Sequence, residues 1–234
     1  MKKNIFLMAS ILLLCNSART QFNERPIMNL ETIDERFLNW GYFLGFNQYD
    51  FKFDYKSDIN DILVNKGIGF NVGLIGEMRI NEFLDLRFEP GLHYGIRTLG
   101  FPNFTTSNEA IREIKSTYIN FPILLKASTR RIGNWKPFII GGVSTSLNLG
   151  SNQDSMDDNS SLQSNSFRMK KKLYSYEIGF GIDFYLEYFK FSPSIRGVFA
   201  ISDELVRDND PDSPWTSNID ALRTRGIFVN FTFE

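Results

Sequence analysis

The sequence predicts an all-β protein, an eight-stranded antiparallel up-and-down transmembrane β-barrel with short periplasmic turns and long extracellular loops. Three observations support this fold class. Long stretches alternate apolar with polar residues, and a period of two is that of a β-strand. Eight such stretches occur, and the connections between them alternate long and short, as in bacterial outer-membrane barrels. The last stretch ends on alternating aromatic residues, Phe231 and Phe233.

The clearest alternation covers residues 67–97 and is interrupted once, at residues 81–83. It predicts two strands of about fourteen residues each, against about five or six in soluble sheets. One face is apolar throughout, and the other carries glycines and charges, which suits a hairpin whose apolar face meets lipid. Cross-strand neighbours follow from the short turn. The expected register pairs Glu77 with Arg87, Arg79 with Asp85, and Gly76 with Phe88.

The other strands are predicted in the same way, in chain order. The eight predicted strands are residues 40–53, 67–80, 84–97, 117–128, 136–149, 173–186, 190–201 and 223–234. We expect a polar loop at residues 54–66, and at residues 98–116 a loop containing a candidate helical patch, residues 108–115. In the first strand the apolar positions change parity past Gln48. Such a change indicates either a β-bulge or the emergence of the strand from the membrane.

The N-terminus has the pattern of a secretory signal, because Lys2 and Lys3 precede the apolar stretch Ile5–Leu14. We expect residues 1–20 to be a signal peptide, residues 21–39 a periplasmic N-terminal tail, and residues 40–234 the outer-membrane β-barrel. The single cysteine, Cys15, falls within the expected signal peptide. The mature chain would then have neither a disulfide nor a reactive thiol.

A soluble lipocalin-like barrel of eight strands is the main structural alternative. It would place the apolar parity inside, so that glycines would face water. Large side chains such as Phe88, Phe180 and Phe184 would then crowd a narrow interior. The aromatic C-terminal strand also resembles the outer-membrane insertion signal, from which Glu234 after the last phenylalanine departs. Both points favour the membrane barrel.

In that barrel the polar parity faces the lumen, where we expect a structural network of charges. An eight-stranded interior is only wide enough for side chains, so a water-filled pore is not expected. Buried charges must be paired, because an unpaired one costs several kcal/mol. The predicted lumen network consists of Glu77, Arg79, Arg87, Glu89, His93, Arg97, Lys126, Glu177, Asp183 and Arg196.

A membrane-embedded hydrolase is the alternative interpretation of these residues. His93 is the only histidine, and Glu89 lies four residues before it on the same face. A hydrolase also needs a nucleophile beside the histidine, and no serine is nearby in that strand. We therefore predict no catalytic residues. With one histidine, no mature cysteine and no Ca²⁺-loop spacing, we predict no metal site and no cofactor.

Composition limits the partners. The net charge is −1, and no lysine and arginine stripe is present, which argues against nucleic acid. Outer-membrane lipid is the expected partner of the apolar face, and the cell outer membrane is the expected location.

Two stretches resemble a known family. Residues 41–47, Gly-Tyr-Phe-Leu-Gly-Phe-Asn, resemble the first strand of the PorT family of outer-membrane barrels from Bacteroidetes. Residues 118–126 and 136–142 resemble the central hairpin of the wider outer-membrane protein β-barrel superfamily. The resemblance implies a non-enzymatic component of the type IX protein secretion system, with other components of that system as partners. It carries no catalytic residues over to this chain.

The candidate contact surfaces for such partners are the Ser/Asn/Asp-rich loop Ser151–Lys172 and the basic turn Thr129–Trp135. Two functions of different classes remain. One is a secretion component that works through its loops or turns. The other is a generic small outer-membrane barrel for ligand binding or membrane stability, with a barrel hydrolase using His93 as its less favoured form.

Overall fold

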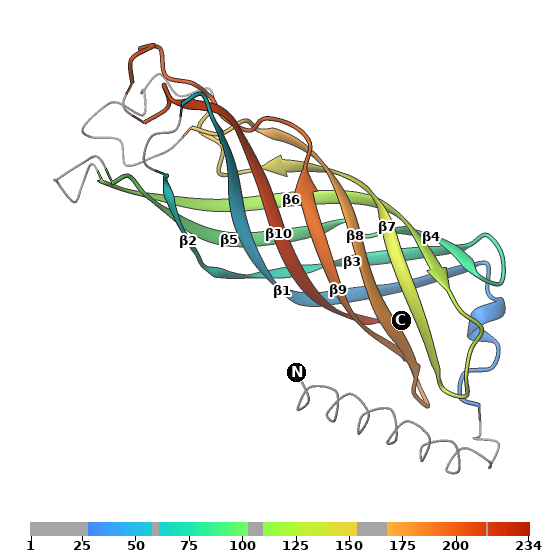
Figure 1. Ribbon diagram of the computed structural model, residues 1–234. Helices are drawn as coiled ribbons and strands as arrows, with labels where there is room; N and C mark the ends of the chain where they lie inside the picture. The colour runs from blue at the N-terminus through green and yellow to red at the C-terminus, as the bar shows by residue number, and fades with distance from the viewer. Residues whose placement is uncertain (1–27, 58–60, 103–109, 154–167, 214) are drawn as a thin grey trace, which may run out of the picture.

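The computed structural model describes residues 28–57, 61–102, 110–153, 168–213 and 215–234, which form one curved, closed sheet (Figure 1). The expected signal peptide, with Cys15, lies outside the described residues. A short 3₁₀ helix, η2 (Ile33–Glu35), precedes the sheet. The strands are β1 (Leu38–Tyr55), β2 (Leu63–Lys66), β3 (Ile68–Arg79), β4 (Leu84–Phe88), β5 (Gly91–Gly100), β6 (Ile111–Ser128), β7 (Trp135–Asn148), β8 (Lys172–Tyr185), β9 (Lys190–Ala200) and β10 (Ile219–Phe233).

These segments make a ring of eight strands, as predicted, because two strands are each interrupted once. Gly67 separates β2 from β3, and Glu89 and Pro90 separate β4 from β5. Proline has no N–H for the ladder, which accounts for the second interruption. All neighbours are antiparallel, and β1 pairs with both β10 and β3, which closes the sheet. Among the described residues no helix is long and apolar enough to span a membrane.

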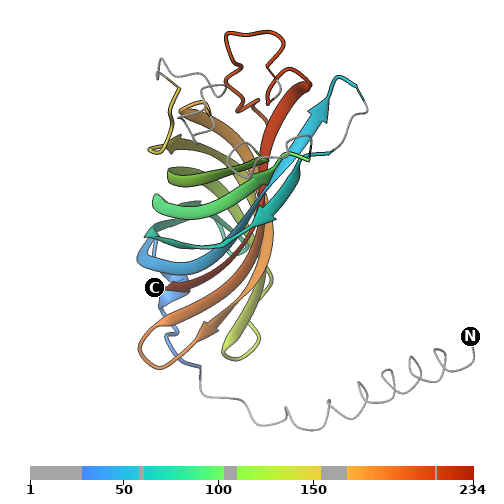
Figure 2. The ribbon, with the colours of Figure 1, turned by 90° about the vertical axis from the view of Figure 1, so that its left-hand side faces the viewer.

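The two ends of the barrel differ in their connections (Figure 2). Residues 80–83, 129–134 and 186–189 make short turns at one end, where residues 28–37 also lie. The described parts of the connections 56–62, 101–110, 149–171 and 201–218 lie at the other end. This is the predicted alternation of short periplasmic turns and long extracellular loops.

The predicted hairpin register is confirmed in all three pairs: Gly76 with Phe88, Glu77 with Arg87, and Arg79 with Asp85. Two loop predictions are wrong in part. Leu63–Lys66, expected in a polar loop, is β2 and pairs with β5. Ile111–Lys115, expected in a helical patch, belongs to β6 and also pairs with β5. In both cases pairing with β5 overrides the local sequence signal.

The parity change past Gln48 is not a bulge. The ladder between β1 and β10 is regular from Tyr42 to Asp54 and shifts only between Asp54 and Tyr55. What changes is the composition of the two faces. On β1 the outward residues are apolar up to Phe46 and polar from Gln48 onward, while the inward residues become aromatic, as at Phe51. The strand therefore leaves the apolar layer at this point, which was the second of the two predicted alternatives.

The barrel thus has two halves. We call the part on the periplasmic side of Gln48 the membrane half, and the part beyond Gln48 the outer half. The membrane half is apolar outside, and its interior combines charged side chains with buried apolar ones such as Phe43, Leu124 and Phe138. The outer half contains an apolar core like that of a soluble protein, built from strands and from the connections 149–171 and 201–218. This core consists of Phe51, Leu99, Phe101, Ile114, Met169, Leu205, Trp215, Ile219 and Leu222.

Candidate functional site

The lumen of the membrane half collects the predicted charges. Strand alternation points every second side chain of β3 to β9 inward. Nine of the ten predicted residues are buried, and the exception is Arg79. Arg79 lies half-exposed at the periplasmic rim, where its Nε donates a hydrogen bond to the carbonyl oxygen of Asn81, 3.4 Å away. It is level with Asp85 in the ladder but stands apart from the buried network.

Glu77 is the centre of the first layer of ion pairs. Its carboxylate lies 3.0 Å from Lys190 Nζ, 3.2 Å from Lys126 Nζ and 3.5 Å from Arg87 Nε. Asp183 takes a second contact from Lys126, at 2.8 Å. Cations from β4, β6 and β9 therefore meet at one carboxylate of β3. Each cation of this layer has a counter-charge.

Glu234 completes this layer and is the member that sequence reasoning missed. Its carboxylate makes ion pairs with Arg87 and with Lys190. The sequence had marked Glu234 only as a departure from an aromatic ending. The signal was present, because Phe233 faces lipid and the next residue of an alternating strand must face the lumen.

A second layer lies on the extracellular side of the first. Arg196 sits between Glu89, at 2.7 Å, and Glu177, at 3.0 Å. Arg87 joins the two layers through Glu89, at 2.9 Å. Removing one partner from such a buried pair leaves an uncompensated charge, which is far more costly than losing a surface pair. The two layers together therefore behave as one electrostatic unit.

His93 lies beyond the ion pairs, among aromatic rings. Its Nδ1 is 3.4 Å from the hydroxyl of Tyr49, and its ring packs edge-on against Phe228 with centroids 5.1 Å apart. Glu89 is occupied by Arg87 and Arg196 rather than directed at the imidazole. The described residues therefore do not assemble a histidine, a carboxylate and a nucleophile at this point. They also contain no group of three or more potential metal-ligating side chains.

Arg97 was predicted as a network member but instead marks the boundary between the two halves. Its guanidinium donates hydrogen bonds to Thr224 Oγ1 at 3.0 Å, Ser116 Oγ at 2.7 Å and the Tyr118 hydroxyl at 2.8 Å. It also lies 3.8 Å from the ring centroid of Phe51. An arginine in this position satisfies polar groups below it and packs against the apolar core above it.

The described residues of the connection 201–218 pack into the interior at the extracellular end. Leu205 and Trp215 are buried in the apolar core. Glu204, on the same connection, accepts hydrogen bonds from the backbone N–H and the hydroxyl of Thr224, at 2.8 and 2.7 Å. Burial raises the pKa of Glu204 to about 7, against the opposing effects of Arg97 and these hydrogen bonds. This segment could not be read from the sequence, because its apolar residues are widely spaced among polar ones.

Glycines make room for the aromatic filling. The ring of Phe43 lies where side chains at Gly73 and Gly91 would stand, and a Cβ at either position would come within 2.6 Å of that ring. Tyr49 covers Gly95 in the same way, at 2.8 Å. The inward glycines on β3 and β5 therefore provide the space that the inward aromatic rings of β1 occupy.

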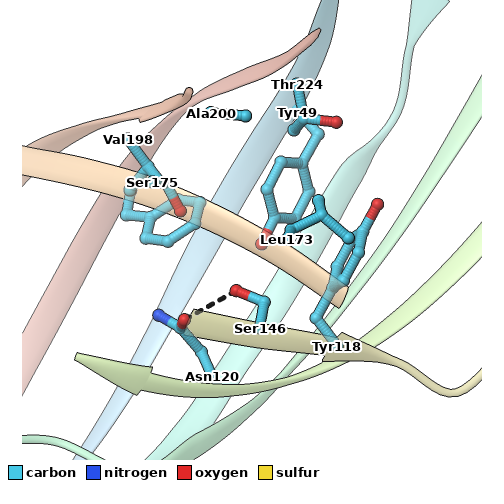
Figure 3. Close-up of a pocket in the computed structure, with 10 residues that line it drawn as sticks. Tyr49, Tyr118, Asn120, Ser146, Leu173, Ser175, Val198, Ala200 and Thr224 are labelled. Carbon is cyan, nitrogen blue, oxygen red and sulfur yellow. Dashed lines mark hydrogen bonds between the residues drawn. The ribbon is translucent and has the colours of Figure 1, made fainter. Parts of the chain in front are cut away.

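Little space remains between these side chains. A cavity of about 20 Å³ lies between the two halves, beside Tyr49, Tyr118 and Phe228 (Figure 3). On another wall of this cavity, Ser146 donates a hydrogen bond to Asn120 Oδ1 at 2.7 Å (Figure 3). A volume of this size holds about one water molecule. The lumen, as far as the described residues fill it, has room for side chains rather than for a ligand.

The residues before β1 cover the periplasmic mouth. Asp34 of η2 accepts a hydrogen bond from the Tyr185 hydroxyl at 2.7 Å and faces Arg131 and Lys136 at 3.7 and 3.9 Å. Arg131 also donates to the carbonyl oxygens of Asn29 and Leu30. The basic turn Thr129–Trp135, predicted as a partner surface, therefore binds the chain's own N-terminal segment through Arg131.

Comparison with known proteins gives one family and several similar structures. A family model described as outer membrane protein beta-barrel domain matches residues 20–206. No curated protein matched the sequence. OprG from Pseudomonas aeruginosa is 13% identical over 84% of this chain and 93% of that one, with a TM-score of 0.41. Neisserial surface protein A is 9% identical over 82% and 95%, with a TM-score of 0.42. Ail of Yersinia pestis is 12% identical over 83% and 96%, with a TM-score of 0.38.

Proposed function

The chain belongs to the outer membrane protein beta-barrel domain family, and we propose that it is a non-enzymatic component of the type IX secretion machinery. In this role it is needed for the export of proteins that carry a C-terminal secretion signal. The family membership places the protein in the outer membrane. The assignment to type IX secretion rests on the resemblance of residues 41–47 to the first strand of the PorT family.

The observation that carries the proposal is the filled lumen. Two layers of paired charges occupy the membrane half, and the described residues of the connection 201–218 pack into the outer half. A barrel filled in this way supports a role through its outer surfaces rather than as a conduit for cargo. Partners would therefore meet the protein at its loops or at its periplasmic end.

Of the two candidate contact surfaces, the structure describes the periplasmic one in full and the extracellular one only in part. The periplasmic one is a composite of the turn Thr129–Trp135 and residues 28–37, held together by Arg131 and Asp34. The extracellular one, Ser151–Lys172, lies mostly outside the described residues. We propose that the composite periplasmic surface binds other components of the machinery.

Gene deletion followed by complementation tests this function. We expect loss of surface-attached type IX cargo in the deletion strain and recovery with the wild-type gene. Arg130→Ala with Arg131→Ala should fail to restore export, whereas Lys170→Ala with Lys171→Ala, on the extracellular side, should restore it. Normal export in the deletion strain would contradict the proposal.

The alternative functions predict different outcomes. A small barrel for ligand binding or membrane stability would leave export normal and weaken the resistance of the envelope to detergents. A hydrolase would require His93, which lies against Tyr49 and Phe228. His93→Phe fills the same space with an aromatic ring, and we expect this variant to support export fully. Loss of export with a folded H93F barrel would favour the hydrolase.

The proposed chain organisation is a signal peptide at residues 1–20, a periplasmic tail at residues 21–39 and the barrel at residues 40–234. N-terminal sequencing of the protein extracted from outer membranes tests the first boundary. We expect the mature chain to begin at Gln21. A chain that retains Lys2 and Lys3 would contradict this organisation.

A further inference from the structure

Four basic side chains gather on the outward face of the outer half, just beyond the apolar band. We call Lys52, Lys66, Arg223 and Arg225 the cationic cluster. They come from β1, β2 and β10, which lie side by side in Figure 1. We propose that this cluster binds the phosphate groups of a phosphorylated glycolipid in the extracellular leaflet of the outer membrane.

A buried carboxylate organises the cluster. Asp50 is only 8% exposed, and its Oδ2 lies 2.9 Å from Lys66 Nζ and 2.8 Å from Arg225 Nη2. Its Oδ1 accepts a hydrogen bond from the backbone N–H of Phe51, at 2.9 Å. Asp50 thus fixes one cation from β2 and one from β10 on either side of β1. Arg225 Nη1 and the other Lys66 N–H groups stay available for an anion.

The cluster carries a positive excess. Asp54 pairs with Arg223 and lies 3.5 Å from Lys52. Four basic groups therefore face two carboxylates, Asp50 and Asp54. The side chains of Lys66 and Arg225 are 42% and 51% exposed. Lysine and arginine side chains held at this spacing suit the closely spaced oxygens of a phosphate.

The height of the cluster matches the lipid headgroups. Ile68, Phe46 and Ile227 are the last apolar outward residues on their strands, and Gln48 is level with Ile68 and Ile227 in the ladder. Asp50 and Arg225 are paired two residues further out, a rise of about 7 Å along a strand. The headgroup layer on each side of a bilayer is about 5–7 Å thick. Acyl chains would meet the isoleucines while the phosphates meet the cations.

On the described strands, the outward cations at this height gather on β1, β2 and β10. On β6 the outward Lys115 pairs with Glu113 at 3.4 Å, so that the two charges cancel. On β8 the outward residues nearest the same rim are Lys172, Tyr174 and Tyr176, so this strand presents a single cation there. A general attraction to anionic lipid would need no such asymmetry. One-sided, organised charge is what a defined headgroup site requires.

The experiment uses the folded barrel in neutral detergent micelles and lipid A with two phosphates as the probe. Retention of the lipid is measured by native mass spectrometry across a titration. We expect Lys66→Gln with Arg225→Gln to weaken binding about tenfold or more, since two charge-assisted contacts are lost. The matched control is Lys115→Gln with Lys172→Gln, which removes the same charge from other strands. It should change binding less than about twofold. Heat-dependent gel mobility verifies that each variant is folded.

Three results would overturn the proposal. One is equal binding by wild type and K66Q/R225Q. Another is equal binding of lipid A and its enzymatically dephosphorylated form, which would show that acyl chains alone are recognised. The third is displacement of lipid A by inorganic phosphate at low millimolar concentration, which would identify a site for a free anion rather than for a lipid headgroup.

Discussion

The two halves of this barrel solve the same packing problem in opposite ways. In the membrane half, ion pairs around Glu77 and Arg196 occupy the lumen together with buried rings such as Phe138, and the outward side chains are apolar. In the outer half the interior is filled by apolar residues such as Phe51 and Leu222, and charges such as Lys52 face outward. The change takes place within a single continuous strand, β1, without a break in its ladder. The composition of the outward face therefore changes at the same level of the barrel as the composition of the interior.

The largest expected effect comes from the centre of the ion-pair network. Glu77→Ala removes the carboxylate that Lys126, Lys190 and Arg87 share in a closed interior. Each cation then keeps only its other partners, which are Asp183, Glu234 and Glu89. We expect a loss of about 3–5 kcal/mol in the free energy of unfolding. Urea unfolding of the barrel in lipid vesicles, followed by tryptophan fluorescence, measures it. The control Glu113→Ala breaks the exposed pair with Lys115 and should cost about 0–1 kcal/mol. Similar losses in the two variants would contradict this, because they would show that water in the lumen screens the ion pairs.

The next effect tests the outer face of the two halves. Leu44→Arg places a charge near the middle of the outward apolar stretch of β1 and should cost about 2–4 kcal/mol. Gln48→Arg places the same charge at the edge of that stretch and should cost about 0–1 kcal/mol. The same unfolding experiment compares them. A cost at Gln48 as large as that at Leu44 would contradict this boundary and place the edge of the membrane further out on β1.

A smaller, local effect is expected in the apolar core of the outer half. Leu205→Ala removes a buried side chain from the connection 201–218. We expect a loss of about 2–3 kcal/mol, at the low end for such a change, because a connection can relax into the space. Hydrogen exchange should show faster exchange at residues 204–206 and no change in β3. Uniformly faster exchange throughout the barrel would mean that the core is not a separate unit. Leu149→Ala, at an exposed position, is the control.

The smallest effect is one of pH. Because burial raises the pKa of Glu204 to about 7, the folded connection binds a proton more readily than the unfolded one. The stability that this proton provides is complete below the unfolded pKa of about 4.3 and is lost as the pH rises through 7. Exchange at residues 204–206 should therefore accelerate between about pH 4.3 and pH 7 and level off above pH 7, after correction for intrinsic rates. Glu204→Gln, uncharged at every pH, should remove this change and behave like the wild type at pH 5. An unchanged pH profile in E204Q would contradict the assignment.

Much of the fold followed from alternation, and the hairpin register followed from it directly. The pairing of Glu77 with Arg87 is correct because a strand period of two and a short turn leave one register that keeps charges off lipid. The extent of strands beyond the membrane was harder to predict. Two such segments, Leu63–Lys66 and Ile111–Lys115, are strands because they pair with β5. Their sequences do not alternate apolar and polar residues in the way that predicts a lipid-facing strand.

The lumen was predicted better than the two mouths of the barrel. Inward charges can be identified strand by strand, but closure depends on segments that meet only in the folded protein. Asp34 meets Tyr185 across 151 residues of sequence, and Glu204 meets Thr224 across the last long connection. No local sequence pattern predicts either contact. Arg97 faces inward and is buried, but its strand position could not show that hydroxyls and an aromatic ring would surround it.

The most direct test of the inversion is the depth of outward side chains on β1. Single cysteines at Leu44 and at Lys52, introduced into the chain with Cys15 replaced by serine, would carry spin labels in a reconstituted bilayer. The account predicts that the label at position 44 collides mainly with oxygen dissolved in lipid, and the label at position 52 with a water-soluble nickel complex. A label at position 52 that is as shielded from nickel as the one at position 44 would contradict it.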